Sequence, residues 1–109
     1  MSESHPPNTT LHPFSEIDRL IHSPARLMVL TYLYVVDRAD YLFLINMTGL
    51  SWGNLSSHLA KLEQAGYVAI TKSFIAKKSH TTVELTEKGR AAFRSYKQQI
   101  LAVLSELPD

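Results

Sequence analysis

The sequence predicts a mainly α-helical domain that carries one small β-hairpin. Two observations lead to this fold class. Hydrophobic residues recur with the 3.6-residue period of an α-helix over most of the chain, but with the two-residue period of a strand between residues 67 and 86. In addition, the 109 residues are 45% hydrophobic, which is enough for one core and too little for two.

The N-terminal residues divide into an arm and the start of the domain. Residues 1–13 hold three prolines and few apolar residues, so we expect them to form a flexible arm. Residues 14–109 should form the folded domain. Ser15 and Asp18 resemble a capping box and predict a short amphipathic helix, whose apolar positions are Phe14, Ile17, Leu20 and Ile21.

Two further helices are expected before residue 50. Ser23 and Pro24 suit the N-cap and the first position of a strongly apolar helix, because the fixed φ of proline is compatible with a first turn. The polar residues 37–40 should form a connector. The apolar residues 41–47 predict the next helix, which Gly49 should end.

The run from Gly49 to Gly66 combines a turn, a capped helix and a stop signal. Gly49 supplies the turn, Ser51 can cap the N-terminus of the following helix, and Gly66 can adopt the positive φ that ends it. One face of this helix is apolar, with Leu55, Leu59 and Leu62 at helical spacing. Trp52 is expected to pack beside them in the core. The outward residues are small or polar, namely Gly53, Asn54, Ser57, Ala60, Lys61 and Gln64.

After Gly66 the alternation of apolar and polar residues predicts two strands, with a hairpin tip at residues 75–80. A final helix should begin near Thr86 and run to about Leu107. Helices, a helix-turn-helix, a β-hairpin and a long last helix follow one another in the order of a winged helix-turn-helix domain.

The same run carries a resemblance to a known family. The chain reads GLSWGNLSSHL and then KLEQAGYV. It resembles, almost letter for letter, the short single-domain winged helix-turn-helix regulators of the MarR/ArsR superfamily. The resemblance extends more loosely from about Ile17 to about Leu107 and includes HSPARLMVL and ELTEKGRAAF. It implies a sequence-specific regulator of transcription that binds double-stranded DNA as a homodimer, on a pseudo-palindromic operator.

The distribution of charge agrees with a nucleic-acid partner although the net charge is only +1. Residues 51–80 carry four lysines and one glutamate, whereas residues 1–50 carry three arginines and five carboxylates. The positive charge therefore gathers on the predicted recognition helix and hairpin, where phosphates would lie.

These patterns indicate eight candidate DNA-binding residues. Amide and hydroxyl side chains near the start of the helix can read base edges, and lysines can contact phosphates or guanine. Wings of related proteins often carry an arginine that enters the minor groove. This hairpin has none, so its lysines are expected to contact phosphate only. The candidates are Ser51, Gly53, Asn54, Ser57 and Lys61 on the helix and Lys72, Lys77 and Lys78 on the hairpin.

Each of these residues also fits an ordinary solvated surface. The alternative function is therefore a winged-helix module for protein–protein assembly, in which the same face meets a protein. Arg90 and Arg94 lie one helical turn apart and suit either a DNA contact or an ion pair within the chain.

The two terminal helices carry the predicted dimer interface. The apolar stripe of the last helix is wider than packing on one small domain requires, so a second chain should cover it. A small-molecule effector, if one binds, should lie at this interface. The interface candidates are Phe14, Ile17, Ile21, Tyr96, Ile100, Val103, Leu104 and Leu107.

Several other classes of function find no support in the sequence. The chain has no cysteine, which excludes disulfides and thiolate metal sites. Its five histidines lack metal-ligand spacing, so neither a metal nor a cofactor is expected. Ser57 and His58 are adjacent and point about 100° apart on a helix, so they cannot form a nucleophile–base pair and no enzyme activity is expected. No apolar run is long enough for a membrane span, and we expect a cytoplasmic protein.

Overall fold

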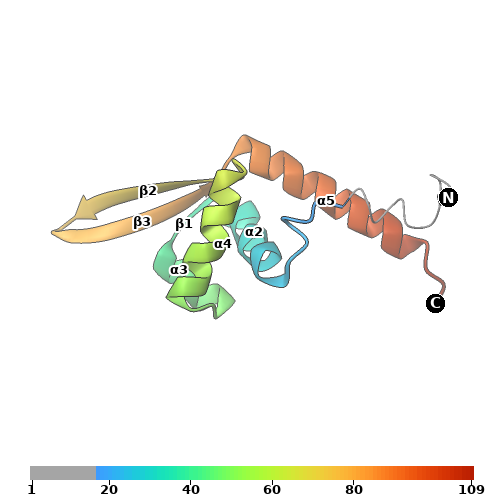
Figure 1. The fold of residues 1–109 in the computed structure, drawn as a ribbon, viewed down its shortest axis with the longest axis horizontal. Helices are drawn as coiled ribbons and strands as arrows, with labels where there is room; N and C mark the ends of the chain where they lie inside the picture. The colour runs from blue at the N-terminus through green and yellow to red at the C-terminus, as the bar shows by residue number, and fades with distance from the viewer. Residues whose placement is uncertain (1–16) are drawn as a thin grey trace, which may run out of the picture.

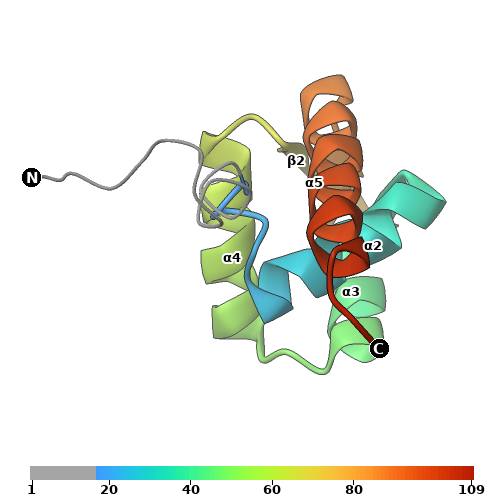
Figure 2. The same cartoon turned by 90° about the vertical axis from the view of Figure 1, so that its right-hand side faces the viewer.

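The structure is a computed structural model that describes residues 17–109. Its elements follow the order α2 (Pro24–Val36), β1 (Arg38–Asp40), α3 (Tyr41–Thr48), α4 (Trp52–Gln64), β2 (Val68–Ile75), β3 (Lys78–Leu85) and α5 (Glu87–Ser105). Helices α2, α3 and α4 form the centre, while the β2–β3 hairpin and α5 project in opposite directions (Figure 1). Helix α2 contacts both α3 and α4, and Figure 2 shows α4 at the left of the view and α5 at the right. The winged helix-turn-helix fold is confirmed.

The core lies between the three central helices, the base of the sheet and the start of α5. Nine of its side chains are fully buried, because helices and strands turn their periodic apolar faces toward one another. These side chains are Ile21, Val29, Leu30, Leu33, Leu44, Leu55, Leu59, Leu62 and Val83.

The predicted first helix is wrong for the part that the structure describes. Residues 17–22 form turns, and the arm and Phe14 lie outside the described residues. The carboxylate of Asp18 accepts hydrogen bonds from the backbone N–H groups of Leu20 at 2.9 Å and Ile21 at 3.2 Å, which closes the chain into a turn. Asp18 also accepts a hydrogen bond from the hydroxyl of Tyr67 at 2.5 Å. Burial and the nearby Asp18 carboxylate together raise the pKa of Tyr67 to about 12.

The predicted polar connector at residues 37–40 contains the short strand β1. Asp37 has a positive φ of 68° and turns the chain directly out of α2, which aligns the next three residues with β3. Ala39 is buried between the exposed Arg38 and Asp40, as expected for a strand with one covered face. Three residues of period-two alternation are too few to recognise in a sequence.

The sheet is antiparallel with the strand order β1–β3–β2. Its hairpin is tighter than predicted, because β2 and β3 remain paired as far as Ile75 and Lys78. Only Ala76 and Lys77 form the turn, and both have a positive φ, as a two-residue hairpin turn of type I′ requires.

Helix α4 begins and ends where the sequence predicted. The hydroxyl of Ser51 accepts a hydrogen bond from the N–H of Asn54 at 3.2 Å. At the C-terminus Gly66 has a φ of 83°, and the N–H of Tyr67 donates to the carbonyl of Leu62 at 2.9 Å. This six-residue hydrogen bond across a left-handed glycine is a Schellman motif.

The first turn of α5 is packed directly against this motif. Thr86 caps α5 by accepting from the N–H of Gly89 at 2.9 Å, and its hydroxyl donates to the carbonyl of Gly66 at 2.6 Å. Gly89 is buried, and a Cβ there would overlap the carbonyl oxygen of Tyr67 and lie 2.9 Å from Cδ1 of Leu85. The backbones therefore approach more closely than any side chain allows.

We expect Gly89→Ala to lower the free energy of unfolding by about 1–3 kcal/mol, since a methyl group at this position forces the backbone apart. Urea denaturation followed by circular dichroism measures the change. Gly53→Ala is the matched control, because a Cβ at Gly53 meets no atom within 4 Å. Equal stability of the Gly89→Ala variant and the wild type would contradict this packing.

Candidate DNA interface

Helices α3 and α4 are joined by a short turn that resembles the turn of DNA-binding helix-turn-helix motifs. Gly49 ends α3 with a φ of 75°, and the hydroxyl of Thr48 accepts from the N–H of Leu50 at 3.2 Å. Asp40 caps the start of α3 by accepting from the N–H of Phe43 at 2.8 Å. Hydrogen bonds thus define the start of α3 and the turn that leads into α4.

The outward face of α4 is as predicted. Leu55, Leu59 and Leu62 are fully buried, so the opposite face must point to solvent. Among its residues, Gly53 has open space around its backbone, which leaves the helix surface accessible there. The five candidates on this helix are all exposed and lie within its first three turns: Ser51, Gly53, Asn54, Ser57 and Lys61.

The prediction that Trp52 packs in the core is wrong. Its side chain is 57% exposed, and its ring stacks on that of Tyr41, with ring centres 5.4 Å apart. The hydroxyl of Tyr41 lies 3.2 Å from the hydroxyl of Ser56. Because Trp52 is the first residue of α4, it extends past the end of the leucine stripe and meets the start of α3 instead. It therefore adds an apolar surface beside the polar face.

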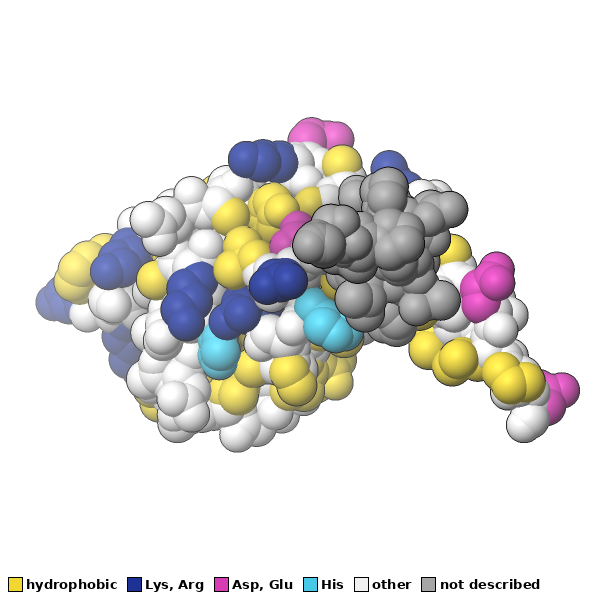
Figure 3. Space-filling model, turned by 45° about the vertical axis from the view of Figure 1, so that its right-hand side comes forward, with side chains coloured by type: hydrophobic (Ala, Val, Ile, Leu, Met, Phe, Trp, Pro, Cys, Tyr) yellow, Lys and Arg dark blue, Asp and Glu magenta, His cyan; other side chains and the backbone are white. Residues whose placement is uncertain are grey.

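One flank of α4 carries a basic cluster that the sequence analysis missed. Arg26, in the first turn of α2, donates from Nε to the carbonyl of Leu20 at 2.6 Å and from Nη1 to Nδ1 of His58 at 3.1 Å. Since arginine can only donate, the proton of His58 lies on Nε2. Lysine, arginine and histidine side chains gather on this side of the molecule (Figure 3). Arg26 and His58 are 32 residues apart, so no spacing rule could link them.

The three lysines of the hairpin form a second, separate group. Lys72, Lys77 and Lys78 are all exposed, at the outer half of a hairpin that projects from the domain (Figure 1). No aspartate or glutamate occurs between Val68 and Val83. The outer hairpin is therefore positively charged throughout.

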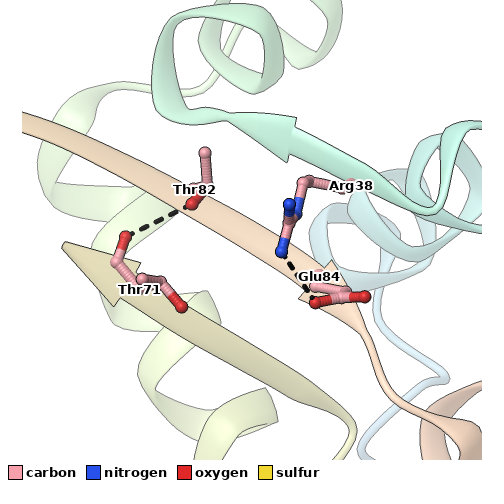
Figure 4. Close-up of polar contacts among 4 residues, drawn as sticks. All are labelled: Arg38, Thr71, Thr82 and Glu84. Atoms are coloured by element: carbon pink, nitrogen blue, oxygen red, sulfur yellow. Dashed lines mark hydrogen bonds and ion pairs between the residues drawn. The ribbon is translucent and has the colours of Figure 1, made fainter. Parts of the chain in front are cut away.

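The base of this hairpin is braced by polar contacts across the sheet (Figure 4). Arg38 of β1 lies 3.2 Å from the carboxylate of Glu84 on β3, and the hydroxyl of Thr82 donates to the carbonyl of Thr71 at 3.4 Å. Strand β1 thus adds a third strand to what would otherwise be an isolated ribbon, which is marginally stable by itself.

Arg90 takes part in an ion pair within the chain. Its guanidinium contacts the carboxylate of Asp37 and stacks 4.6 Å from the ring centre of Tyr34. The guanidinium of the neighbouring Arg94 favours the charged phenolate of Tyr34 and lowers the pKa of that phenol. The sequence left two roles open for Arg90, a DNA contact or an ion pair within the chain, and Arg90 forms the ion pair.

The predicted dimer residues fall into three groups. Ile17, Ile21 and Tyr96 are at most 6% exposed because they belong to the core of a single chain, which corrects their assignment to an interface. Ile100 and Val103 are partly exposed. Leu104 and Leu107, at the C-terminal end of the chain, are 55% and 63% exposed, and the neighbouring Leu101 is 55% exposed as well.

Residues 17–109 contain neither a metal-binding cluster nor a membrane-spanning helix. No group of three or more histidine, aspartate or glutamate side chains in this range could hold a metal ion. None of the helices in this range combines the length and the apolar character of a membrane span.

Comparison with known proteins agrees with this geometry. Residues 25–104 match the family model described as a winged helix DNA-binding domain. The chain belongs to this family. Its fold is also that of MarR-family transcriptional regulators, as the resemblance in the sequence implied.

Three known proteins are similar to this chain. An uncharacterised protein of Methanocaldococcus jannaschii, MJ0432, is 36% identical over 76% of this chain and 90% of its own. A transcriptional regulator homologue from Pyrococcus horikoshii OT3 is 27% identical, with a TM-score of 0.80 over 90% of this chain and 98% of its own. The transcriptional repressor CouR, solved with a 23-mer DNA duplex, is 26% identical, with a TM-score of 0.68 over 89% of this chain and 68% of its own.

We expect His58 to titrate below the ordinary histidine pKa of about 6.5. Burial of its ring, and then the positive charges of Arg26 and Lys61, lower this pKa. The unfolded chain therefore takes up the proton first, and stability falls as the pH drops below about 6.5 and through the folded pKa. NMR titration of the imidazole measures the value.

Arg26→Gln should raise the pKa of His58 toward the ordinary value, because it removes one positive neighbour. Arg38→Gln, which alters an arginine paired on the sheet, is the control. A His58 pKa that is the same in Arg26→Gln and wild type would contradict the contact.

Proposed function

We propose that the protein is a sequence-specific regulator of transcription that binds double-stranded DNA as a homodimer on a pseudo-palindromic operator. The observation that carries this proposal is the exposed, small and polar face of α4 on a helix whose opposite face is fully buried. The thirteen residues of α4 span about 20 Å, and the major groove is wide enough to accept such a helix.

Each part of the interface has a distinct role in this proposal. Asn54 and Ser57 face the groove and read base edges, while Ser51 and Lys61 contact bases or phosphates near them. Arg26 and the hairpin lysines contact phosphates on either side. That CouR, which shares the fold, was solved with a DNA duplex supports this assignment.

The end of α5 provides the dimer contact in our proposal. Leu101 and Leu104 are exposed on a helix that projects beyond the domain, Leu107 is exposed just after the end of this helix, and hydrophobic side chains gather at this end (Figure 3). A twofold pairing through them would place two α4 helices on the same face of DNA, about 34 Å apart for successive major grooves. A small-molecule effector would act at this same contact.

An anisotropy titration tests the proposal as a whole. Labelled duplexes from the gene's own upstream DNA and a scrambled duplex of equal composition are titrated at two salt concentrations. We expect tighter binding to the upstream duplex, and weaker binding to both at higher salt because phosphate contacts release counterions. Absence of salt-dependent binding to either duplex would overturn the proposal and favour the protein–protein assembly module.

We expect Asn54→Ala and Ser57→Ala to reduce discrimination between the upstream and scrambled duplexes more than they reduce binding to the scrambled one. Loss of a good base contact costs on the order of 1–3 kcal/mol at one position. The affinity ratio of the two duplexes is the measurement. Ser95→Ala, at an exposed serine of α5, is the matched control. Unchanged ratios in both variants would refute the assignment of the reading face.

We expect the double variant Leu104→Glu and Leu107→Glu to be a folded monomer that binds the upstream duplex weakly. Both side chains are exposed on one chain, so the change disrupts the contact between chains and leaves the core intact. Light scattering gives the mass, and circular dichroism confirms the fold. Val35→Glu, at an apolar side chain that is 76% exposed on α2, should remain dimeric. A monomeric wild type that still discriminates the upstream duplex would rule out this mode of assembly.

A further inference from the structure

The tip of the hairpin exposes two large apolar side chains. Phe74 is 76% exposed and Ile75 is 57% exposed, although neither contributes to the core. Phe74 pairs with the small Ser79 on β3, which leaves the ring uncovered. Exposed aromatic surface at the end of a projecting element is typical of a binding contact.

The tip is also built to be rigid. The two-residue turn keeps β2 and β3 paired to their ends, with Ile75 opposite Lys78. Ala76 and Lys77 both adopt the left-handed region, with φ values of 52° and 64°, which residues with a Cβ disfavour. This disfavoured backbone conformation makes the turn as short as two residues, so Phe74 lies next to the end of a fully paired hairpin.

The charge around these apolar side chains indicates the partner. Lys72 lies two residues before Phe74 and so projects from the same face of β2, while Lys77 and Lys78 follow directly after the apolar pair. With no carboxylate between Val68 and Val83, an apolar tip that is flanked by lysines is complementary to a polyanion that offers an apolar interior. The minor groove of DNA has both properties, because its phosphate walls enclose stacked bases.

We propose that Phe74 enters the minor groove beside the base pairs read by α4 and acts as an apolar wedge at one base step, while the hairpin lysines contact the flanking phosphates. This inference rests on the proposed DNA-binding function. Such a wedge partly unstacks the step and bends the duplex, which costs least at flexible pyrimidine–purine steps. The hairpin would therefore contribute sequence preference through the deformability of the DNA, without reading base edges.

Three variants separate the wedge from the phosphate contacts: Phe74→Ala, Phe74→Leu and the double variant Lys77→Ala with Lys78→Ala. For Phe74→Ala we expect about tenfold weaker binding to the upstream duplex with an unchanged salt slope, because one buried ring but no charge is lost. Phe74→Leu should retain part of the affinity. The lysine variant should flatten the salt slope by roughly 1 per lost contact.

Energy transfer between dyes at the two duplex ends measures the bend. Phe74→Ala should give a larger end-to-end distance than wild type, and the lysine variant should keep most of the bend. Thermal melting should be the same for all variants, since the altered side chains are exposed.

The outcomes distinguish this inference from the function on which it rests. If wild type does not bind DNA at all, the proposed function fails. If wild type discriminates the upstream duplex but Phe74→Ala matches it in affinity and in bend, the wedge is overturned and the function stands. Sedimentation of wild type, but not Phe74→Ala, with vesicles of anionic lipid and no effect of that variant on DNA would assign the tip to a membrane surface instead.

Discussion

The close approach of α5 to the end of α4 is the constraint on which the rest of the structure depends. Gly66 lets the chain turn at the end of α4. The hydroxyl of Thr86 donates to the carbonyl of Gly66 and accepts from the N–H of Gly89 in the first turn of α5. Gly89 places no side chain between the two backbones. The end of α4, the base of the hairpin and the start of α5 meet at this point. Their relative directions are therefore fixed by backbone contact, which tolerates far less adjustment than contact between flexible side chains.

Short-range sequence patterns made most of the fold predictable. The wrong predictions concern segments whose structure depends on contacts with other parts of the chain. The leucine stripe of α4 and its capping residues Ser51 and Gly66 are short-range patterns, and the structure has them as expected. Strand β1 exists only because β3 is available to pair with it. The turns at residues 17–22 replace a helix because Asp18 bonds the backbone locally and its neighbours Ile17 and Ile21 reach the core.

The candidate site shows the same division. Sequence periodicity correctly selected which side chains of α4 face solvent, since the buried stripe determines the opposite face. The contact of Arg26 with His58 joins two helices, and only the folded chain brings them together. The resulting surface has two chemically distinct parts. Helix α4 holds one lysine and one glutamate among neutral polar residues, whereas the outer hairpin combines lysines with apolar side chains.

The stack of Trp52 on Tyr41 has a practical consequence for solution studies. Trp52 is the only tryptophan among the 109 residues, and it lies at the first turn of α4 with more than half of its side chain in contact with solvent. Its emission therefore arises only from the edge of the solvent-facing side of α4. Any partner that covers this end of α4 removes water from the indole. The fluorescence of Trp52 therefore reports binding at this end of α4 in the unlabelled protein.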